Sequence, residues 1–286
     1  ITSGLLCSEI GDGTEDIHLF IDIGTNGELV IGNQDFLVTC ACSAGPAFEG
    51  GGIEHGMRAS AGAVDKVEID PETGTPQYNT IDNVNPKGIC GSGMISLIAN
   101  LFRSGWLDAA GKLHREKSCR SIEINENGRN ARYIIAGRDE TVSGQPIWVS
   151  ESDIENIIRA KAAIYSAAAL MLEQLGLDFE SLSGIYIAGG FGRFLNIENA
   201  ITLGLLPDIP REKFHYIGNS SLTGAYLVLI SQEYRQKQTE LANRMTYMEL
   251  STEPSYMHQY TGALFIPHTE ISLFPSIKID GNKRMK

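Results

Sequence analysis

The sequence lacks the features of several large classes of protein. It has no apolar run of about 18 residues, which a membrane-spanning helix would need. Basic residues are few, 23 Lys and Arg against 35 Asp and Glu, and the net charge of -12 argues against nucleic acid or a membrane surface as partner. There is no signal peptide and the first residue is Ile1, so we expect a fragment of a longer chain.

Cysteine is sparse. The five residues are Cys7, Cys40, Cys42, Cys90 and Cys119, and most of their neighbours are apolar or glycine. An odd number in such surroundings fits reduced thiols in a cytoplasmic protein better than a disulfide framework. Cys40 and Cys42 resemble half of a metal site, but no second Cys or His pair follows at zinc or iron–sulfur spacing, so we predict no metal site.

Familiar catalytic and nucleotide-binding signatures are also missing. The chain has no G-x-S-x-G elbow, and its histidines have no partners at metal or triad spacing. Gly111-Lys112 is followed by Leu113 instead of Ser or Thr, which excludes a P-loop. A Rossmann fingerprint would need a glycine where Ser96 stands, so this fingerprint is discounted as well.

Glycine, by contrast, is plentiful, and its 31 residues cluster beside apolar runs. The stretch IHLFIDIGTNGELVIG, residues 17–32, predicts a hairpin that turns at Asn26. A hairpin alone does not require Asp22, Thr25 and Glu28. Amide groups and hydroxyls in a tight turn hold phosphates, and a nearby carboxylate can orient Mg²⁺ through water. The sequence alone leaves two interpretations of this stretch open, a phosphate-binding turn and an ordinary hairpin.

The stretch GICGSG precedes an apolar pattern with helical spacing, expected from about 91 to 105. Gly91, Ser92 and Gly93 would let an anion approach the start of this helix. The alternative is that small residues here serve close packing.

Two further glycine turns follow apolar runs that predict buried strands. IAGGFGRF contains Gly189, Gly190 and Gly192, where a flat ring could lie against the backbone. GNSS, residues 218–221, is a weaker turn of the same kind between a predicted strand and a predicted helix.

The order of elements predicts an α/β fold of the ribonuclease-H-like type with insertions. Three short strands are expected over 17–23, 28–31 and 35–42, followed by strand–helix alternation. Residues 1–15 are predicted to form a lead-in strand and turn, and 245–275 to be extended.

The clearest helix lies in SESDIENIIRAKAAIYSAAALMLEQLG. Ser152 followed by Glu155 predicts a capping box at its start. Gly176 predicts its end.

Six blocks taken together resemble the C-terminal region of the reductive activators of corrinoid proteins, within the actin, sugar-kinase and heat-shock-chaperone ATPase superfamily. The blocks are DIGTNGE, CSAGPAFEGGGIEHGMRA, GICGSGMI, YIAGGFG, GNSSLTGA and ALFIPH. The resemblance implies one actin-like ATPase region over 1–286. Its core would be about 17–102 and 183–232, with an insertion at about 103–182 and a family-specific tail at about 245–275.

The resemblance also implies a function. Such activators use ATP with Mg²⁺ to return an inactive Co(II) corrinoid protein to Co(I), and they carry a plant-type ferredoxin domain. ATP binding would change the complex so that the uphill reduction proceeds. This chain has one of the two phosphate hairpins of the superfamily and lacks the ferredoxin cysteines. An iron–sulfur cluster is therefore expected only in a missing N-terminal domain, and a homodimer is one option for assembly.

The residues that match the family motifs are the expected site. Asp22 is the expected catalytic residue. The expected cofactor-binding residues, in chain order, are Gly24, Thr25, Asn26, Gly27, Glu28, Gly91, Ser92, Gly93, Lys161, Gly189, Gly190, Phe191 and Gly192. Two other functions stay open: a phosphotransferase of the sugar-kinase type that acts on a small metabolite, and a non-catalytic module that docks a corrinoid protein.

Overall fold

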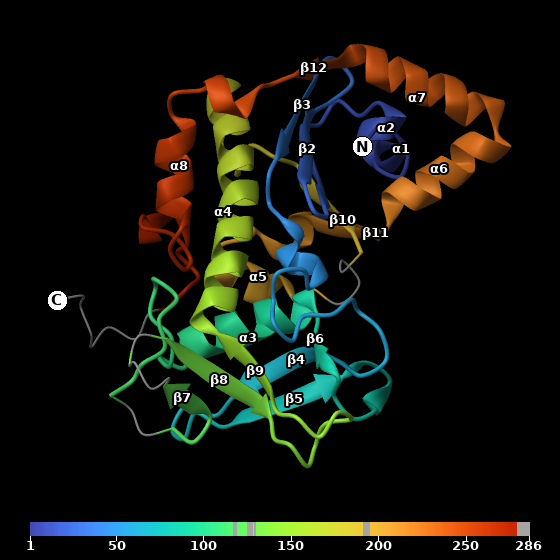
Figure 1. Cartoon of the computed structure of the whole chain (residues 1–286). Helices are drawn as coiled ribbons and strands as arrows, with labels where there is room; N and C mark the ends of the chain where they lie inside the picture. The colour runs from blue at the N-terminus through green and yellow to red at the C-terminus, as the bar shows by residue number, and fades with distance from the viewer. Residues whose placement is uncertain (117–118, 125–127, 129, 191–194, 279–286) are drawn as a thin grey trace.

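A mixed sheet of six strands lies at the centre of the computed structural model, in the order β11-β10-β1-β2-β3-β12 (Figure 1). β1, β2 and β3 are antiparallel neighbours, whereas β10 and β11 run parallel to β1 and β12 runs parallel to β3. The strands are β1 (His18–Ile23), β2 (Gly27–Gly32), β3 (Leu37–Cys42), β10 (Gly184–Gly189), β11 (Phe214–Gly218) and β12 (Met245–Tyr247). The structure describes residues 1–116, 119–124, 128, 130–190 and 195–278.

The three strands predicted at the start of the chain are confirmed, and both faces of their sheet are buried. Leu19 and Ile21 point into the main core, whereas Phe20 and Val30 point into a second apolar cluster, as the alternation of a strand requires. Helix α4 (Glu151–Gln174) packs on β2 and β3 from the side of the main core. The helices that border the second cluster are α1 (Thr2–Leu5), α2 (Glu9–Asp12), α6 (Ser220–Ile230) and α7 (Gln232–Arg244).

The lead-in strand predicted for residues 1–15 is wrong, because this segment forms α1 and α2. Leu5 and Ile10 are fully buried, and Leu6 is nearly so. The two helices are single turns, too short for their apolar spacing to stand out in the sequence.

Between β3 and α4, the described part of residues 43–150 forms most of the lower half of the molecule in Figure 1. It contains two sheets of three strands, β5-β4-β6 and β7-β8-β9, with α3 packed on β4. The helix predicted to begin at Gly91 is confirmed. The elements are β4 (Ala63–Ile69), β5 (Pro76–Thr80), β6 (Gly88–Ile89), α3 (Gly91–Arg103), β7 (Ile122–Ile124), β8 (Ala131–Ala136) and β9 (Ile147–Ser150).

Helix α4 (Glu151–Gln174) is the long helix predicted from sequence, and its position in the fold is central. Its capping box differs from the prediction: Ser150 accepts a hydrogen bond from Asp153 N, and the Asp153 side chain accepts one from Ser150 N. Ser152 therefore lies inside the first turn. The predicted end near Gly176 is confirmed, since α4 stops at Gln174 and Gly176 has a φ of 68°.

The tail predicted as extended contains a helix, α8 (Tyr256–Ala263), packed along α4. In Figure 1, α4 stands between α8 and the strands β2 and β3. The chain then continues through ALFIPH, where Ile266 and Pro267 are buried. The remaining described helix of the core is α5 (Ile197–Leu203).

Candidate nucleotide site

The carboxyl ends of β1, β10 and β11 meet at one edge of the six-stranded sheet. The register pairs Ile23 with Gly189, and Ala188 with Gly218. Three of the glycine turns found in the sequence therefore adjoin one another, although they come from distant parts of the chain. The edge that holds the carboxyl ends of parallel strands is where α/β folds commonly bind ligands.

The turn between β1 and β2 is short and open to solvent. Gly24 N donates a hydrogen bond to Asn26 O at 3.0 Å, which closes the turn. Thr25 and Asn26 are exposed. Of the described atoms, only Asn26 O would lie within 4 Å of a Cβ on Gly24, at 3.8 Å, so a ligand can approach this backbone.

Asp22 lies just before this turn and is held by the start of α6. Ser221 Oγ donates a hydrogen bond to Asp22 Oδ2 at 2.5 Å. Ser221 belongs to the GNSS turn, so the structure joins the strongest and the weakest of the sequence motifs. The residues from 219 to 222 form a capped helix start, because Asn219 Oδ1 accepts a hydrogen bond from Leu222 N.

Two further carboxylates make this edge acidic. Glu28 is the cross-strand neighbour of Asp22. Burial and the Asp22 carboxylate raise the pKa of Glu28 above its ordinary value. Thr25 Oγ1 donates a hydrogen bond to Glu49 Oε2 at 2.5 Å, which ties the loop after β3 to the hairpin. Asp22 and Glu28 lie close enough for their charges to interact, and their oxygens suit the water shell of a divalent cation, because hard cations prefer oxygen ligands.

The strand β10 ends in the predicted double glycine. Gly189 has a φ of 123°, and a Cβ atom there would lie 2.3 Å from Ile23 O, so the position requires glycine. Gly190 is exposed, and among the described residues no atom lies within 4 Å of a Cβ added there. Phe191 and Gly192 lie outside the described residues.

The glycines at the start of α3 lie in close contact with neighbouring backbone. A Cβ on Gly91 would lie 2.1 Å from Phe48 O, and one on Gly93 would lie 2.1 Å from Val64 O. Ser92 is buried, with its Oγ 3.2 Å from Cys90 Sγ. Protein atoms thus fill the space that a ligand would need beside these glycines.

Gly27 has a similar packing role at the start of β2. A Cβ there would lie 2.7 Å from Cys42 Sγ and 3.0 Å from Ile164 Cγ1. Gly27 therefore lets α4 approach the hairpin closely instead of facing a ligand.

Lys161 does not reach the hairpin edge. Its side chain is fully buried, and Nζ donates hydrogen bonds to Phe265 O at 2.6 Å and Pro267 O at 2.7 Å. Burial lowers the pKa of Lys161 well below its ordinary value. In this conformation Lys161 anchors the ALFIPH segment to α4, and its contact with a nucleotide stays a prediction.

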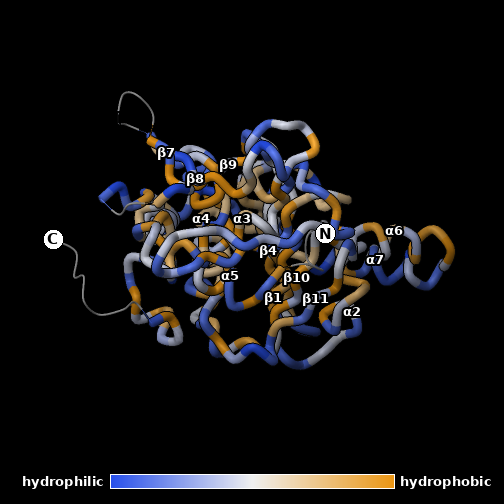
Figure 2. Tube along the Cα trace, turned by 90° about the horizontal axis from the view of Figure 1, so that it is seen from below, coloured by the Kyte–Doolittle hydropathy of each residue, from blue (hydrophilic) through white to orange (hydrophobic). Residues whose placement is uncertain are grey.

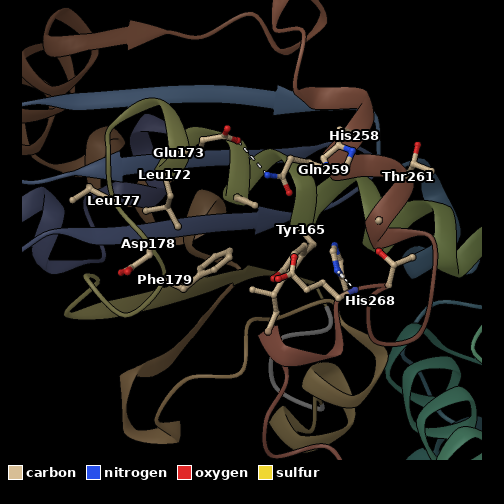
Figure 3. A pocket seen from close by; sticks show the side chains of 15 residues that line it. Tyr165, Leu172, Glu173, Leu177, Asp178, Phe179, His258, Gln259, Thr261 and His268 are labelled. Atoms are coloured by element: carbon tan, nitrogen blue, oxygen red, sulfur yellow. Dashed lines mark hydrogen bonds between the residues drawn. The ribbon is translucent and has the colours of Figure 1, made fainter. Parts of the chain in front are cut away.

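A pocket of about 500 Å³ lies between α4 and α8, next to this anchor (Figure 3). Tyr165 and Phe179 line its apolar part, and Glu173, Asp178 and Glu270 are among its polar residues. No Lys or Arg is among its described lining residues. The hairpin edge adds an open glycine turn and carboxylates that can hold a hydrated cation, so it is the better candidate for a nucleotide.

The described residues show neither a metal-ion cluster nor a membrane-spanning helix. Within that part of the chain, no three His, Cys, Asp or Glu side chains come together as a metal-ion site. No helix in the same residues has the length and apolar character needed to cross a membrane.

Sequence reasoning missed Ser221 and Glu49 as members of the site. Ser221 stands in a turn that directly follows a predicted strand, which was the available signal. Glu49 carried no signal beyond its place in the CSAGPAFEGGG block, because its contact depends on how the loop after β3 folds back.

Comparison with known proteins gives the family. A protein-family model described as the C-terminal domain of RACo, the ASKHA domain, matches residues 16–278. A corrinoid activation enzyme, RamQ, of Eubacterium limosum is 36% identical over 252 residues, which are 85% of this chain and 42% of that protein. A reductase of the Co(II) methylated amine-specific corrinoid protein of Methanosarcina barkeri is 27% identical over 264 residues, 85% of this chain and 44% of its own.

A solved structure agrees with these relatives. The reductive activator for corrinoid, iron-sulfur protein superposes with a TM-score of 0.91 at 49% identity, over 96% of this chain and 44% of that one. The chain thus spans less than half the length of the relatives that it matches. The predicted actin-like fold and the resemblance to corrinoid activators are confirmed. This chain belongs to the family of the C-terminal domain of RACo, the ASKHA domain.

Proposed function

We propose that the edge of the sheet around Asp22 binds the phosphates of ATP together with Mg²⁺. The observation that carries this proposal is the hydrogen bond from Ser221 Oγ to Asp22 Oδ2, which holds a carboxylate between two open glycine turns. The family is one of ASKHA domains, and this is the fold of the actin-like nucleotide-binding ATPases.

The residues present fit such a ligand. Asp22 and Glu28 offer carboxylate oxygens for the water shell of the cation, and the turn at Gly24 has an exposed backbone that a phosphate can approach. Gly190 leaves room for the nucleoside beside the backbone. When bound, Mg²⁺ would neutralise phosphate charge. Asp22 would orient water in that shell, and the hydroxyl of Ser221 would keep its carboxylate in place.

We propose further that the domain serves as the ATP-dependent half of an activator that returns a corrinoid protein from Co(II) to Co(I) in the cytoplasm. The relatives whose names describe this activity support it. They are more than twice as long as the matched part, which leaves room outside this domain for the iron–sulfur cluster and the second phosphate loop that the proposal requires.

The experiment that tests the site uses two Asp substitutions in the full-length protein. Asp22→Asn should abolish ATP-dependent activation of the corrinoid protein, followed by the absorbance of Co(I), and should weaken Mg-ATP binding in calorimetry. Asp35→Asn is the matched control, because Asp35 is an exposed residue of the opposite hairpin, between β2 and β3. Equal activity of the two variants would overturn the assignment.

A further inference from the structure

Helix α6 exposes a continuous apolar surface. Leu222, Tyr226, Leu229 and Ile230 recur at positions i, i+4, i+7 and i+8, which lie on one side of a helix, and they are between 61% and 74% exposed. We call these four residues the α6 stripe. Ser220 and Gly224 are the buried residues of the helix.

The composition of α6 is unusual for a helix at the surface. Its sequence SSLTGAYLVLI contains no charged residue. The next helix, α7, projects beside it (Figures 1 and 2) but has the charged residues expected of a helix that faces solvent. Its charged residues are Glu233, Arg235, Lys237, Glu240 and Arg244. An apolar surface of this kind, on an otherwise charged protein, marks a contact with another polypeptide.

A segment that precedes the family domain already lies on another side of α6. A Cβ atom on Gly224 would lie 1.8 Å from Ser3 O, so α1 and α6 are in backbone contact. Cys7 Sγ is 3.7 Å from Ser220 O. The family match begins at residue 16, so both contacts come from chain that runs ahead of the domain.

The relatives indicate which polypeptide covers the stripe. This chain corresponds to 42% to 44% of their length, and the family is described as a C-terminal domain, so the rest of those proteins precedes it. We infer that the α6 stripe docks the region that precedes this domain in the full-length activator, through an uncharged apolar face. This inference rests on the proposed function, which makes the chain the C-terminal part of that activator.

Docking at α6 would act directly on the nucleotide site. The stripe begins at Leu222, and the neighbouring Ser221 holds Asp22. A partner that fixes α6 therefore also fixes the carboxylate at the hairpin edge. The two parts of the activator would close over the nucleotide along this helix.

Hydrogen exchange in the absence of nucleotide tests the docking. Amides of residues 220–230 should exchange at least about tenfold more slowly in the full-length protein than in residues 1–286. Leu229→Glu in the full-length protein should raise their exchange to the level of residues 1–286. Val142→Glu is the matched control, because Val142 is also a largely exposed apolar residue, on the loop between β8 and β9.

Three results would overturn the inference. The first is equally fast exchange of α6 in both proteins. The second is protection that grows with protein concentration and follows dimer formation in sedimentation, which would assign the stripe to a second copy. The third is protection that appears only when the corrinoid protein is added. In each case, Mg-ATP binding that Asp22→Asn abolishes would show that the proposed function still stands.

Discussion

Ser221 and Asp22 are joined by a hydrogen bond of 2.5 Å although 199 positions separate them in the sequence. The contact links the end of β1 to the start of α6, across the edge where β10 and β11 also end. A carboxylate that would otherwise swing in solvent is thereby fixed in one orientation. The geometry of the proposed cation site depends on this pair.

Ser221→Ala removes the donor and leaves Asp22 free to rotate. We expect the Kd for Mg-ATP in the full-length protein to rise by about tenfold, which corresponds to about 1.4 kcal/mol. The thermal midpoint of unfolding should stay unchanged, since the pair is only partly buried. Ser143→Ala, in an exposed loop, serves as the control, and wild-type affinity in Ser221→Ala would show that the pair does not position Asp22.

Glu28 gives the protein a pH dependence of known sign. Its pKa is raised in the folded state by burial and by Asp22, so the folded protein binds more protons than the unfolded chain between the two pKa values. The free energy of unfolding therefore falls as pH rises through this interval. Glu28→Gln should stabilise the protein at pH 7 by a few tenths to about 1 kcal/mol, as expected for like charges opposite each other.

That gain should vanish below the ordinary pKa of glutamate, about 4.3. Urea denaturation at both pH values measures it, with Glu72→Gln in an exposed turn as the control. A loss of stability at pH 7 in Glu28→Gln would contradict the assigned repulsion.

Glu49 places a third negative charge beside the hairpin turn, through its bond to Thr25. Nucleotide without a cation should therefore bind poorly, and EDTA should weaken ATP binding to the full-length protein by more than about tenfold. Glu49→Gln should reduce this dependence on Mg²⁺, whereas Glu72→Gln should leave it as it is. Calorimetry with and without Mg²⁺ gives both values, and an unchanged Mg²⁺ dependence in Glu49→Gln would speak against a shared cation site.

Lys161→Met should loosen the tail without changing the nucleotide site. Two backbone acceptors lose their donor, so we expect a loss of about 1–3 kcal/mol in stability at pH 7 and faster exchange in residues 256–268. Because the pKa of Lys161 is lowered in the folded state, the stability of the wild type should rise with pH up to about 10.4, and the variant should lack this rise.

Arg159→Met, on an exposed side of the same helix, is the control for Lys161→Met. If Lys161→Met weakened Mg-ATP binding by tenfold or more while the tail kept its protection, Lys161 would be a nucleotide contact in the bound state after all.

Local patterns were sufficient for the hairpin and for the longer elements of the fold, but not for the short helices α1, α2 and α8. Alternating apolar residues and the Asn26-Gly27 turn specify β1 and β2, and the apolar spacing after Gly91 specifies α3. The cap of α4 was predicted two residues too late, at Ser152 instead of Ser150, because each of these serines is followed three residues later by an acidic residue. Only the end of β9 at Ser150 decides between the two.

The rest of the site depends on contacts that no local pattern contains. The register of β10 and β11 brings Ser221 to Asp22, and the fold of the loop after β3 brings Glu49 to Thr25. Lys161 shares its helix with exposed charged residues, so only the docking of the tail shows that it is buried.

The proposed division of the chain into a core and an insertion stays a prediction. Helix α4 lies within the expected insertion at 103–182 but packs on β2 and β3 of the central sheet.

Hydrogen exchange of residues 1–286 with and without Mg-ATP tests the central claim most directly. The isolated domain holds one half of the phosphate clamp, so we expect binding at about millimolar or weaker and negligible hydrolysis. Exchange should slow in the hairpin 22–28 and in the turn 218–222, and Asp22→Asn should abolish this protection while Asp35→Asn preserves it. Micromolar binding would show that the clamp is complete within this chain. Protection confined to the pocket between α4 and α8, or unaffected by Asp22→Asn, would contradict a nucleotide site at the edge of the sheet.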